Sequence, residues 1–135
     1  MIIGLGCDIV NLERLNKGAY FLKHFQNKIL GVDEKNELAL LPEKNENELV
    51  CLLGKYYAGK EAFAKALGTG FRDGIFLKDI QIVHDKLGKP DLKISGEALV
   101  YLKKIAPKAN CLITLSDDYP FAQAVVVIEN MESQK

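Results

Sequence analysis

The segment from about residue 46 to residue 67 constrains the fold most, because its apolar residues recur with the period of an α-helix. Projected at about 100° per residue, they form one stripe along the predicted helix. The stripe contains Leu49, Leu52, Leu53, Tyr56, Phe63, Ala64 and Leu67. Gly68 and Gly70 follow where this helix would end. We therefore expect a long central helix that lies on the core.

Three charged residues stand near the end of this helix. Lys60 falls in the middle of the apolar stripe, Glu61 lies at its edge, and Lys65 follows one turn later. One interpretation is a Lys60 side chain that reaches solvent along its apolar stem, together with an ordinary surface pair of Glu61 and Lys65. The other is a functional site, because charge removed from water must be paired or must bind an ion.

Residues 2–10 are predicted to form a strand that carries Asp8 inside an apolar run. In an extended chain Gly4, Gly6, Asp8 and Val10 share one face, and Ile3, Leu5, Cys7 and Ile9 share the other. Glycine in a strand often marks the close approach of a ligand or another backbone, which suits a carboxylate that holds a hydrated metal. The alternative is an aspartate that caps a helix beginning near Asn11. Asp8 and the charged helix end together suggest a metal-and-phosphate site.

The rest of the chain is predicted as short helices over about 12–41, broken by Gly31 and Pro42, a strand near 75–84 and a turn at Gly88-Lys89-Pro90. A short strand over 92–94, a helix over about 95–105 and strands over about 111–116 and 121–129 follow. Because strands and helices do not alternate regularly, we expect an α+β fold. It would be a single compact domain over residues 1–130, with the long helix packed on a mainly antiparallel sheet and a loose tail at 131–135.

The composition agrees with one globular domain without selecting its chemistry. The chain has 135 residues, of which 48% are hydrophobic, and no net charge at pH 7. No apolar run approaches the ~18–20 residues of a membrane span and no signal-peptide pattern is present, so we expect no membrane partner and a cytoplasmic location. The three cysteines lack CxxC spacing and are expected to be reduced thiols.

Several chemistries lack their residues. The two histidines, His24 and His84, have no metal-ligand spacing, and no serine lies in a Gly-x-Ser-x-Gly elbow. No GxxxxGK[ST] loop is present, so phosphate binding of the P-loop kind is excluded. The segment Gly68-Thr69-Gly70 is more typical of a helix stop, although its glycines would let backbone N–H groups approach a phosphate beside Lys65.

The charges are unevenly distributed along the neutral chain. Between residues 14 and 28 the sequence carries only basic charges, from Arg14, Lys17, Lys23, His24 and Lys28, whereas residues 33–48 are mainly acidic. This pattern indicates either a solvated helix face or a local basic surface. The basic set is short and has no stacking motif, so nucleic acid is not the expected partner.

These motifs resemble, in order and over nearly the whole chain, the holo-acyl-carrier-protein synthase family. The resemblance rests on Gly4-Leu5-Gly6-Cys7-Asp8-Ile9-Val10 followed by Arg14, on KEAFAKALGTG at 60–70, on Gly88-Lys89-Pro90 and on the final strand pair at 112–129. It implies a 4′-phosphopantetheinyl transferase, which moves the phosphopantetheine arm of coenzyme A to a serine of apo-acyl carrier protein and releases adenosine 3′,5′-bisphosphate. This reaction supports fatty acid biosynthesis.

The resemblance also implies roles for individual residues. Asp8 and Glu61 would bind Mg²⁺, and Lys65 would complete the catalytic set. Coenzyme A would be bound by Lys60, Lys65, Gly68, Thr69, Gly70, Lys89 and Pro90. The acidic carrier would dock on Arg14, Lys17 and Lys23, with Phe25 as an apolar contact. The family forms a homotrimer with active sites between subunits, which composition and spacing do not test.

Two positions depart from the family pattern. Tyr56 stands where the family usually has arginine, and Leu112 stands where it usually has histidine. Nucleotide contacts from these positions are therefore not carried over to this chain. Lys55 carries a positive charge beside the first of them, but one residue along a helix turns the side chain by about 100°.

The predicted phosphoryl transfer requires mainly that the protein position the substrates and neutralise their phosphate charge. The group that acts as the general base is left open. Two other classes of function remain. A magnesium-dependent phosphohydrolase would use the same carboxylates on water, but would not need the basic segment. An inactive carrier-binding module would keep that segment, but would not need Asp8 and Glu61.

Overall fold

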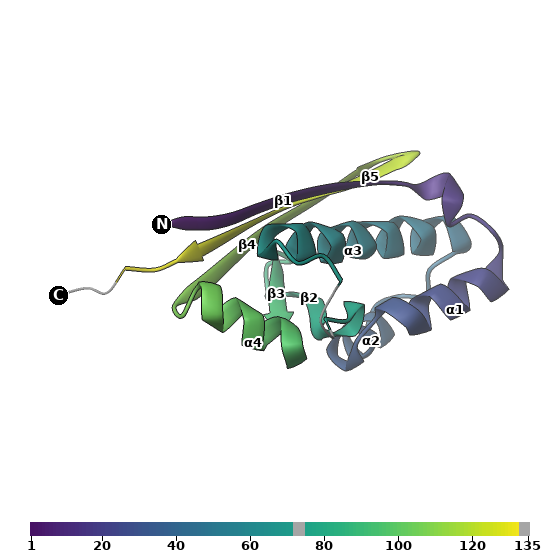
Figure 1. Cartoon of the computed structure of the whole chain (residues 1–135). Coiled ribbons are helices and arrows are strands. Elements are labelled where there is room, and N and C mark those ends of the chain that lie inside the picture. Colours follow the sequence, from purple (N-terminus) through teal and green to yellow (C-terminus); the bar gives the residue numbers. More distant parts are fainter. Residues whose placement is uncertain (72–74, 133–135) are drawn as a thin grey trace.

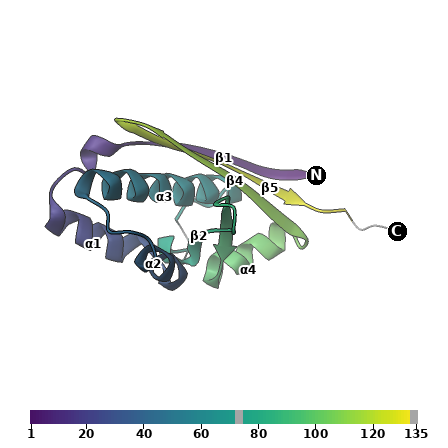
Figure 2. The same cartoon turned by 180° about the vertical axis from the view of Figure 1, so that it is seen from behind.

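The structure, a computed structural model, describes residues 1–71 and 75–132. Within them, three layers lie one above another (Figure 1). A three-stranded sheet forms the first layer and the long helix α3 (Glu46–Leu67) the second. Shorter helices and a two-stranded hairpin form the third, as the view from behind also shows (Figure 2). This arrangement confirms the predicted α+β fold with a long central helix.

All the strand pairs in the described part of the chain are antiparallel. The sheet has the order β1 (Ile2–Asn11), β5 (Phe121–Asn130) and β4 (Ala109–Asp118), so β1 and β4 are its edges. The hairpin pairs β2 (Ile80–His84) with β3 (Pro90–Ile94). The remaining elements are α1 (Ala19–Ile29), α2 (Val32–Ala39), α4 (Gly96–Ile105) and the short 3-10 turns η1 (Leu12–Arg14) and η2 (Leu77–Asp79).

Helix α3 begins and ends where the sequence predicts. The Asn45 side chain accepts a hydrogen bond from the Glu48 N–H at 2.8 Å, which caps the first turn. Gly68 ends the helix with φ at 85°, a left-handed conformation that glycine adopts without strain. The sheet covers one side of α3, and α1 and β2 cover the other. Because the helix is covered on two sides, the single apolar stripe predicted from the sequence was too narrow. No helix in the described part of the chain, α3 included, is long and apolar enough to cross a membrane.

The glycines of β1 bring this strand against the backbone of α3. A Cβ atom on Gly6 would lie 1.8 Å from the Ala62 carbonyl oxygen, and one on Gly4 would lie 2.0 Å from that of Ala66. Both distances are far below van der Waals contact, so only glycine permits this approach. Of the two neighbours that glycine marks in a strand, a ligand or another backbone, the structure shows another backbone, that of helix α3.

Lys60 is fully buried on the other side of α3. Its ammonium group donates to the Glu34 carboxylate at 2.6 Å and to the carbonyl oxygens of Leu77 at 3.1 Å and Ile80 at 2.5 Å. Both interpretations of Lys60 made from the sequence, a side chain that reaches solvent and a phosphate ligand, are therefore wrong. All three ammonium protons are used inside the core.

Glu34, the partner of Lys60, joins three elements. Its carboxylate also accepts hydrogen bonds from the backbone N–H groups of Gly31 at 3.0 Å and Ile82 at 3.1 Å. Burial raises the pKa of Glu34 and lowers that of Lys60, because loss of water disfavours both charges, and their mutual attraction opposes both shifts. The pair therefore ties α2 and β2 to α3.

Several boundaries differ from the sequence prediction, and β3 and β4 begin earlier than expected, at Pro90 and Ala109. The strand expected near 75–84 covers only Ile80–His84, because residues 77–79 form the turn η2 that presents a carbonyl to Lys60. The predicted tail at 131–135 falls mostly on residues 133–135, which lie outside the described residues. Met131, its first residue, donates a backbone hydrogen bond to the Lys108 carbonyl at 2.9 Å.

Replacing one member of the buried pair is expected to destabilise the fold strongly. Lys60→Met would leave the Glu34 carboxylate buried without its counter-ion, a change that costs about 3–5 kcal/mol of unfolding free energy. Urea denaturation monitored by circular dichroism measures this loss. The control is Lys55→Met, which changes another lysine of α3. It removes the solvent-accessible pair of Lys55 with Asp117 of β4 and should cost at most about 1 kcal/mol. Equal losses in the two variants would contradict the assignment.

Candidate active site

Asp8, Glu61 and Lys65 meet where β1 crosses the last turns of α3. The Lys65 ammonium lies 2.9 Å from Asp8 Oδ1 and 3.0 Å from the Cys7 carbonyl oxygen. Because Asp8 shares its face of β1 with Gly4 and Gly6, the close packing of the two elements turns its carboxylate toward the helix. The structure thus brings together the three residues predicted to be catalytic.

Glu61 joins the cluster through the helical repeat. It lies four residues before Lys65, so both side chains emerge on the same face of α3. The hydrogen bond to Asp8, followed by the charges of Asp8 and Glu61, raises the pKa of Lys65. Lys65 therefore stays protonated at neutral pH beside two carboxylates.

Tyr57 is a fourth member of the cluster that the sequence did not single out. Burial, a hydrogen bond to the Glu61 carboxylate and the charges of Glu61 and Asp8 raise the pKa of its hydroxyl to about 12. The signal for it was available, because Tyr57 precedes Glu61 by four residues and therefore lies on the same helix face. The apolar stripe does not include Tyr57, so the stripe gave no reason to single it out.

The donor set fits magnesium. The described residues contain no group of three or more His, Cys, Asp and Glu side chains placed to hold an ion. Mg²⁺ is commonly bound through one or two carboxylates, with phosphate oxygens and water completing its six ligands. Asp8 and Glu61 match this pattern, and Lys65 neutralises the charge of Asp8.

The segment Gly68-Thr69-Gly70 lies just beyond this cluster and first of all ends the helix. The Gly68 N–H bonds the Lys65 carbonyl oxygen at 3.0 Å, and the Gly70 N–H bonds that of Ala64 at 3.2 Å. The Thr69 hydroxyl donates to the Gly70 carbonyl oxygen at 2.9 Å. Both glycines have positive φ angles. These contacts agree with the helix-stop interpretation of the segment.

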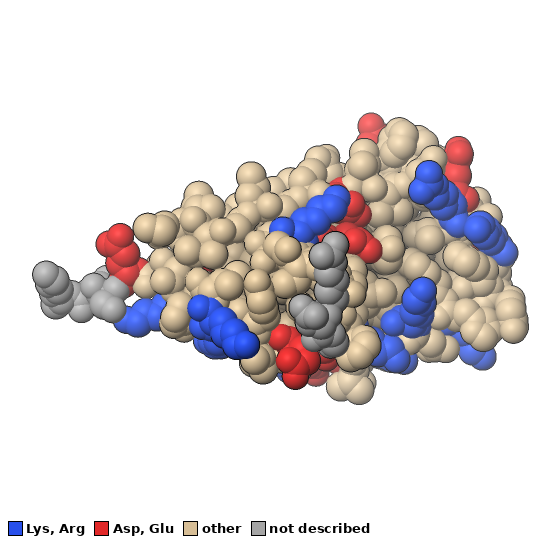
Figure 3. All heavy atoms as spheres, viewed as in Figure 1, with Lys and Arg blue, Asp and Glu red and all other residues tan. Residues whose placement is uncertain are grey.

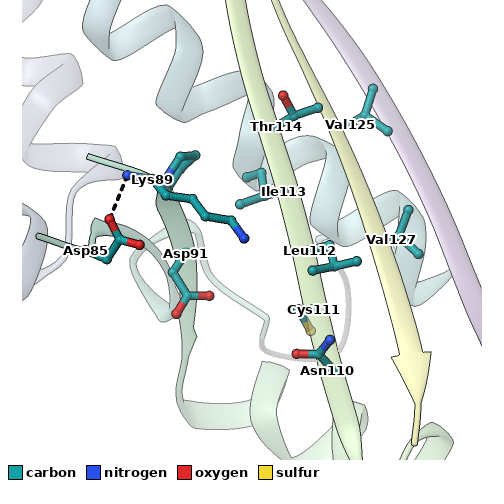
Figure 4. Close-up of a pocket in the computed structure, with 11 residues that line it drawn as sticks. Asp85, Lys89, Asp91, Asn110, Cys111, Leu112, Ile113, Thr114, Val125 and Val127 are labelled. Atoms are coloured by element: carbon teal, nitrogen blue, oxygen red, sulfur yellow. Dashed lines mark hydrogen bonds between the residues drawn. The ribbon is translucent and has the colours of Figure 1, made fainter. Parts of the chain in front are cut away.

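Lys89 and Pro90 lie at a different place, in a pocket of about 510 Å³ between the β2–β3 hairpin and β4 (Figure 4). The Lys89 backbone N–H donates to Asp85 Oδ1 at 2.9 Å, which shapes the turn, and Figure 4 shows the Lys89 side chain directed toward β4. Leu112 on β4 also lines this pocket. The pocket opens at the β4 edge of the sheet, whereas Asp8 lies on the β1 edge.

Tyr56, the first of the two departures from the family pattern, lies inside the protein. Its ring is buried and stacks on His84 with centroids 6.1 Å apart. Burial raises the pKa of its hydroxyl. The neighbouring Lys55 pairs with Asp117 at 3.2 Å, so its charge is used within the chain. The structure thus provides no replacement here for an exposed arginine.

The residues predicted to dock a carrier lie on η1, on α1 and between them. Arg14, Lys17 and Lys23 are exposed, and basic side chains gather over this end of the molecule in Figure 3. Phe25, the expected apolar contact, is half-buried. Its ring packs on Phe21, with centroids 5.9 Å apart, and on Tyr57, with centroids 5.5 Å apart.

Residues 4–124 match the family model of the 4′-phosphopantetheinyl transferase superfamily, and the chain belongs to this superfamily. It is 41% identical to a holo-[acyl-carrier-protein] synthase of Erythrobacter litoralis, over 96% of this chain and 97% of that protein. These findings confirm the resemblance inferred from Asp8 and the segment 60–70.

Solved structures agree with this assignment. A holo-[acyl-carrier-protein] synthase of Neisseria meningitidis has a TM-score of 0.78 and 37% identity, covering 96% of this chain and 99% of that chain. A synthase of Bacillus anthracis in complex with CoA (3′,5′-ADP) has a TM-score of 0.76 and 31% identity, covering 97% and 99%. The likeness therefore includes the whole arrangement of elements that surrounds the cluster.

Proposed function

We propose that this protein is a holo-acyl-carrier-protein synthase. It transfers the 4′-phosphopantetheine arm of coenzyme A to a serine of apo-acyl carrier protein and releases adenosine 3′,5′-bisphosphate, in support of fatty acid biosynthesis. The observation that carries this proposal is the cluster of Asp8, Glu61 and Lys65 in a member of the phosphopantetheinyl transferase superfamily. The cytoplasmic location predicted from the sequence is part of the proposal.

Asp8 and Glu61 are the proposed magnesium ligands. When bound, the ion would withdraw charge from the pyrophosphate of coenzyme A and stabilise the departing phosphate. Lys65 would leave Asp8 and neutralise a phosphate oxygen, for which its protonated state suits it. Lys60 has no part in this site, because its ammonium is buried with Glu34.

The chain's own groups also limit the choice of a proton acceptor. Lys65 and Tyr57 have raised pKa values and hold their protons at neutral pH. The carboxylates of Asp8 and Glu61 are therefore the groups in this cluster that can accept the proton of the carrier serine. The remaining task of the cluster is to hold the pyrophosphate and the serine in line.

The proposed coenzyme A site also includes Gly68, Thr69, Gly70, Lys89 and Pro90. The pocket of Lys89 and Pro90 opens at the β4 edge of the sheet, and Asp8 lies at the β1 edge. The proposed coenzyme A pocket and the carboxylate cluster therefore lie at opposite edges of one sheet. A homotrimer with active sites between subunits would join the β1 edge of one copy to the β4 edge of the next.

The outer face of the sheet supports this assembly. Leu5 and Ile9 are 67% and 62% exposed on β1, on the face opposite to α3. In the strand register, Leu5 lies beside Val127, which in turn lies beside the exposed Leu112. An apolar row of this kind on a sheet face is typical of a surface that another protein chain covers.

The basic surface on η1 and α1 favours a transferase over a phosphohydrolase. Carrier recognition needs a surface of opposite charge, which the exposed Arg14, Lys17 and Lys23 would provide to an acidic carrier. Hydrolysis does not need such a surface. An inactive carrier-binding module would not need two carboxylates beside Lys65. Mass spectrometry of the carrier separates the three functions.

With coenzyme A, Mg²⁺ and apo-carrier, the protein should add one phosphopantetheine group to the carrier and release an equal amount of adenosine 3′,5′-bisphosphate. EDTA, Asp8→Asn and Glu61→Gln should each stop both events, because each removes the ion or one of its ligands. Mass spectrometry and nucleotide chromatography measure the two products. Release of nucleotide without a change in carrier mass would identify a hydrolase, and binding without either product would identify the inactive module.

The basic surface should act mainly on association with the carrier. Lys17→Glu combined with Lys23→Glu should raise the KM for carrier several-fold at low salt, with little change in the KM for coenzyme A. Lys103→Glu combined with Lys104→Glu makes the same charge change on α4 and should leave the KM for carrier nearly unchanged. A similar increase in both double variants would show that net charge, and not this surface, governs association.

The outer sheet face should control assembly. Leu5→Lys places a charge in the apolar row and should convert trimer to monomer in analytical ultracentrifugation, with loss of transfer activity. Leu40→Lys, which changes an exposed leucine outside the sheet, should leave the sedimentation coefficient unchanged. A wild-type protein that sediments as a monomer would contradict the proposed trimer.

A further inference from the structure

Tyr20 lies on the basic surface with its ring in solvent. It is 79% exposed, more than any other tyrosine or phenylalanine among residues 1–71 and 75–132. It stands in the first turn of α1, on the face of the helix opposite to the buried Leu22 and Ile29. Tyrosine is among the side chains that contribute most when a partner protein covers them, so this exposed ring is a candidate contact.

The ring of Tyr20 is held in one orientation by His24, which follows one helical turn later. The two ring centroids are 4.4 Å apart, and the rings meet edge to face at an interplanar angle of 61°. A ring that is already oriented loses little conformational freedom when a partner covers it. The other aromatic rings of α1 differ, because Phe21 and Phe25 are half-buried and stack on each other.

Positive charge borders the Tyr20 ring. Lys23 follows Tyr20 by three residues and shares its helix face. The Lys17 ammonium lies over the ring of Phe21, the neighbour of Tyr20 in the chain, 5.2 Å from the ring centroid. Both lysines are exposed, and residues 14–28 contain no acidic side chain. The surface therefore has an apolar centre and a positively charged rim, as protein–protein interfaces commonly do.

This arrangement fits a partner that carries two kinds of group. Carboxylates would pair with the lysines of the rim, but exposed pairs contribute little affinity, because water and salt screen them. An aliphatic side chain among those carboxylates would cover the Tyr20 ring and remove both apolar surfaces from water. A polyanion without such a side chain would pair with the lysines and leave the ring exposed.

Resting on the proposed function, we propose that Tyr20 is the apolar contact by which this protein selects its carrier, and that the carrier surface it takes bears an aliphatic side chain among carboxylates. The lysines then determine how fast the two proteins meet, and Tyr20 determines how long they stay together. Phe25, whose ring packs on Phe21 and Tyr57, holds α1 on α3 instead.

The first test removes the ring. Tyr20→Ala should raise the KM for carrier about tenfold, as truncation of an interface hot spot does, and should change kcat and the KM for coenzyme A less than about twofold. Tyr20→Phe, which keeps the ring, should behave as the wild-type protein does. Leu40→Ala, which removes a side chain that is 88% exposed outside the basic surface, should leave the KM for carrier unchanged. An unchanged KM in Tyr20→Ala, or an equal increase in Tyr20→Phe, would overturn the inference.

The salt dependence distinguishes loss of the ring from displacement of the lysines. In Tyr20→Ala, kcat/KM for carrier should fall with rising salt as steeply as in the wild-type protein, because no charge is removed. Lys17→Glu combined with Lys23→Glu should flatten this dependence. Flattening by Tyr20→Ala alone would mean that the lysines had moved, and would overturn the role of the ring.

The second test identifies the carrier side chain without turnover. In a carrier whose acceptor serine is replaced by alanine, each exposed aliphatic residue among the carboxylates is changed to serine in turn. Fluorescence anisotropy gives the affinity of each carrier for the wild-type protein and for Tyr20→Ala. At one position the change should weaken binding to the wild-type protein several-fold and to Tyr20→Ala hardly at all, because the two side chains share one contact. Equal effects at every position would overturn the proposed carrier surface.

Vesicles of phosphatidylglycerol provide an anionic surface without protein side chains. They should bind the wild-type protein and Tyr20→Ala with similar affinity, through the lysines alone. A loss in Tyr20→Ala as large as that for carrier would assign the ring to a lipid surface and overturn the inference.

These results separate the inference from the proposed function. If the wild-type protein modifies the carrier and Tyr20→Ala has an unchanged KM, the inference fails and the proposed function stands. If the wild-type protein binds the carrier through Tyr20 without modifying it, the proposed function fails and the contact stands. If it neither binds nor modifies the carrier, both fail.

Discussion

The close contact between β1 and α3 is the constraint on which the rest of the structure depends. Gly4 and Gly6 have no side chain, so the strand backbone lies directly against the carbonyl oxygens of Ala62 and Ala66. Asp8 follows on the same face and is carried to the side of Lys65. A larger residue at either glycine would separate the two elements and widen the cluster, because backbone atoms cannot yield as a flexible side chain does.

The opposite side of α3 is held by charge and not only by apolar contact. Lys60 and Glu34 are both buried and satisfy each other together with backbone groups from α2, η2 and β2. Such a pair contributes less net stability than its attraction suggests, because both charges lose their water. Its directional bonds nevertheless accept only one placement of these elements. The two adjacent residues Lys60 and Glu61 thus serve different purposes, one in the core and one in the cluster.

The cluster itself is held loosely enough to bind a ligand. Lys65 is about half exposed, and its bond to Asp8 can be exchanged for one to a phosphate at small cost. Tyr57 is more firmly placed, because its ring is packed on Phe25. A half-exposed cation beside two carboxylates suits a site that must receive a charged substrate.

Local patterns and motifs in the sequence were sufficient to predict five features. They are the limits of α3, its glycine stop, the strand of Asp8, the α+β class and the family. Helical spacing alone placed Glu61 and Lys65 together, because residues four apart share a helix face. The role of Lys60 was decided only by the tertiary structure, since its partner Glu34 is 26 residues away and one of its carbonyl acceptors, Leu77, belongs to a turn that the pattern predicted as strand. The neighbour of Gly6 and the contact of Tyr57 with Phe25 were decided in the same way. Each is a contact between elements distant in the chain, and the free energy of such contacts depends on packing that one-dimensional periodicity does not record.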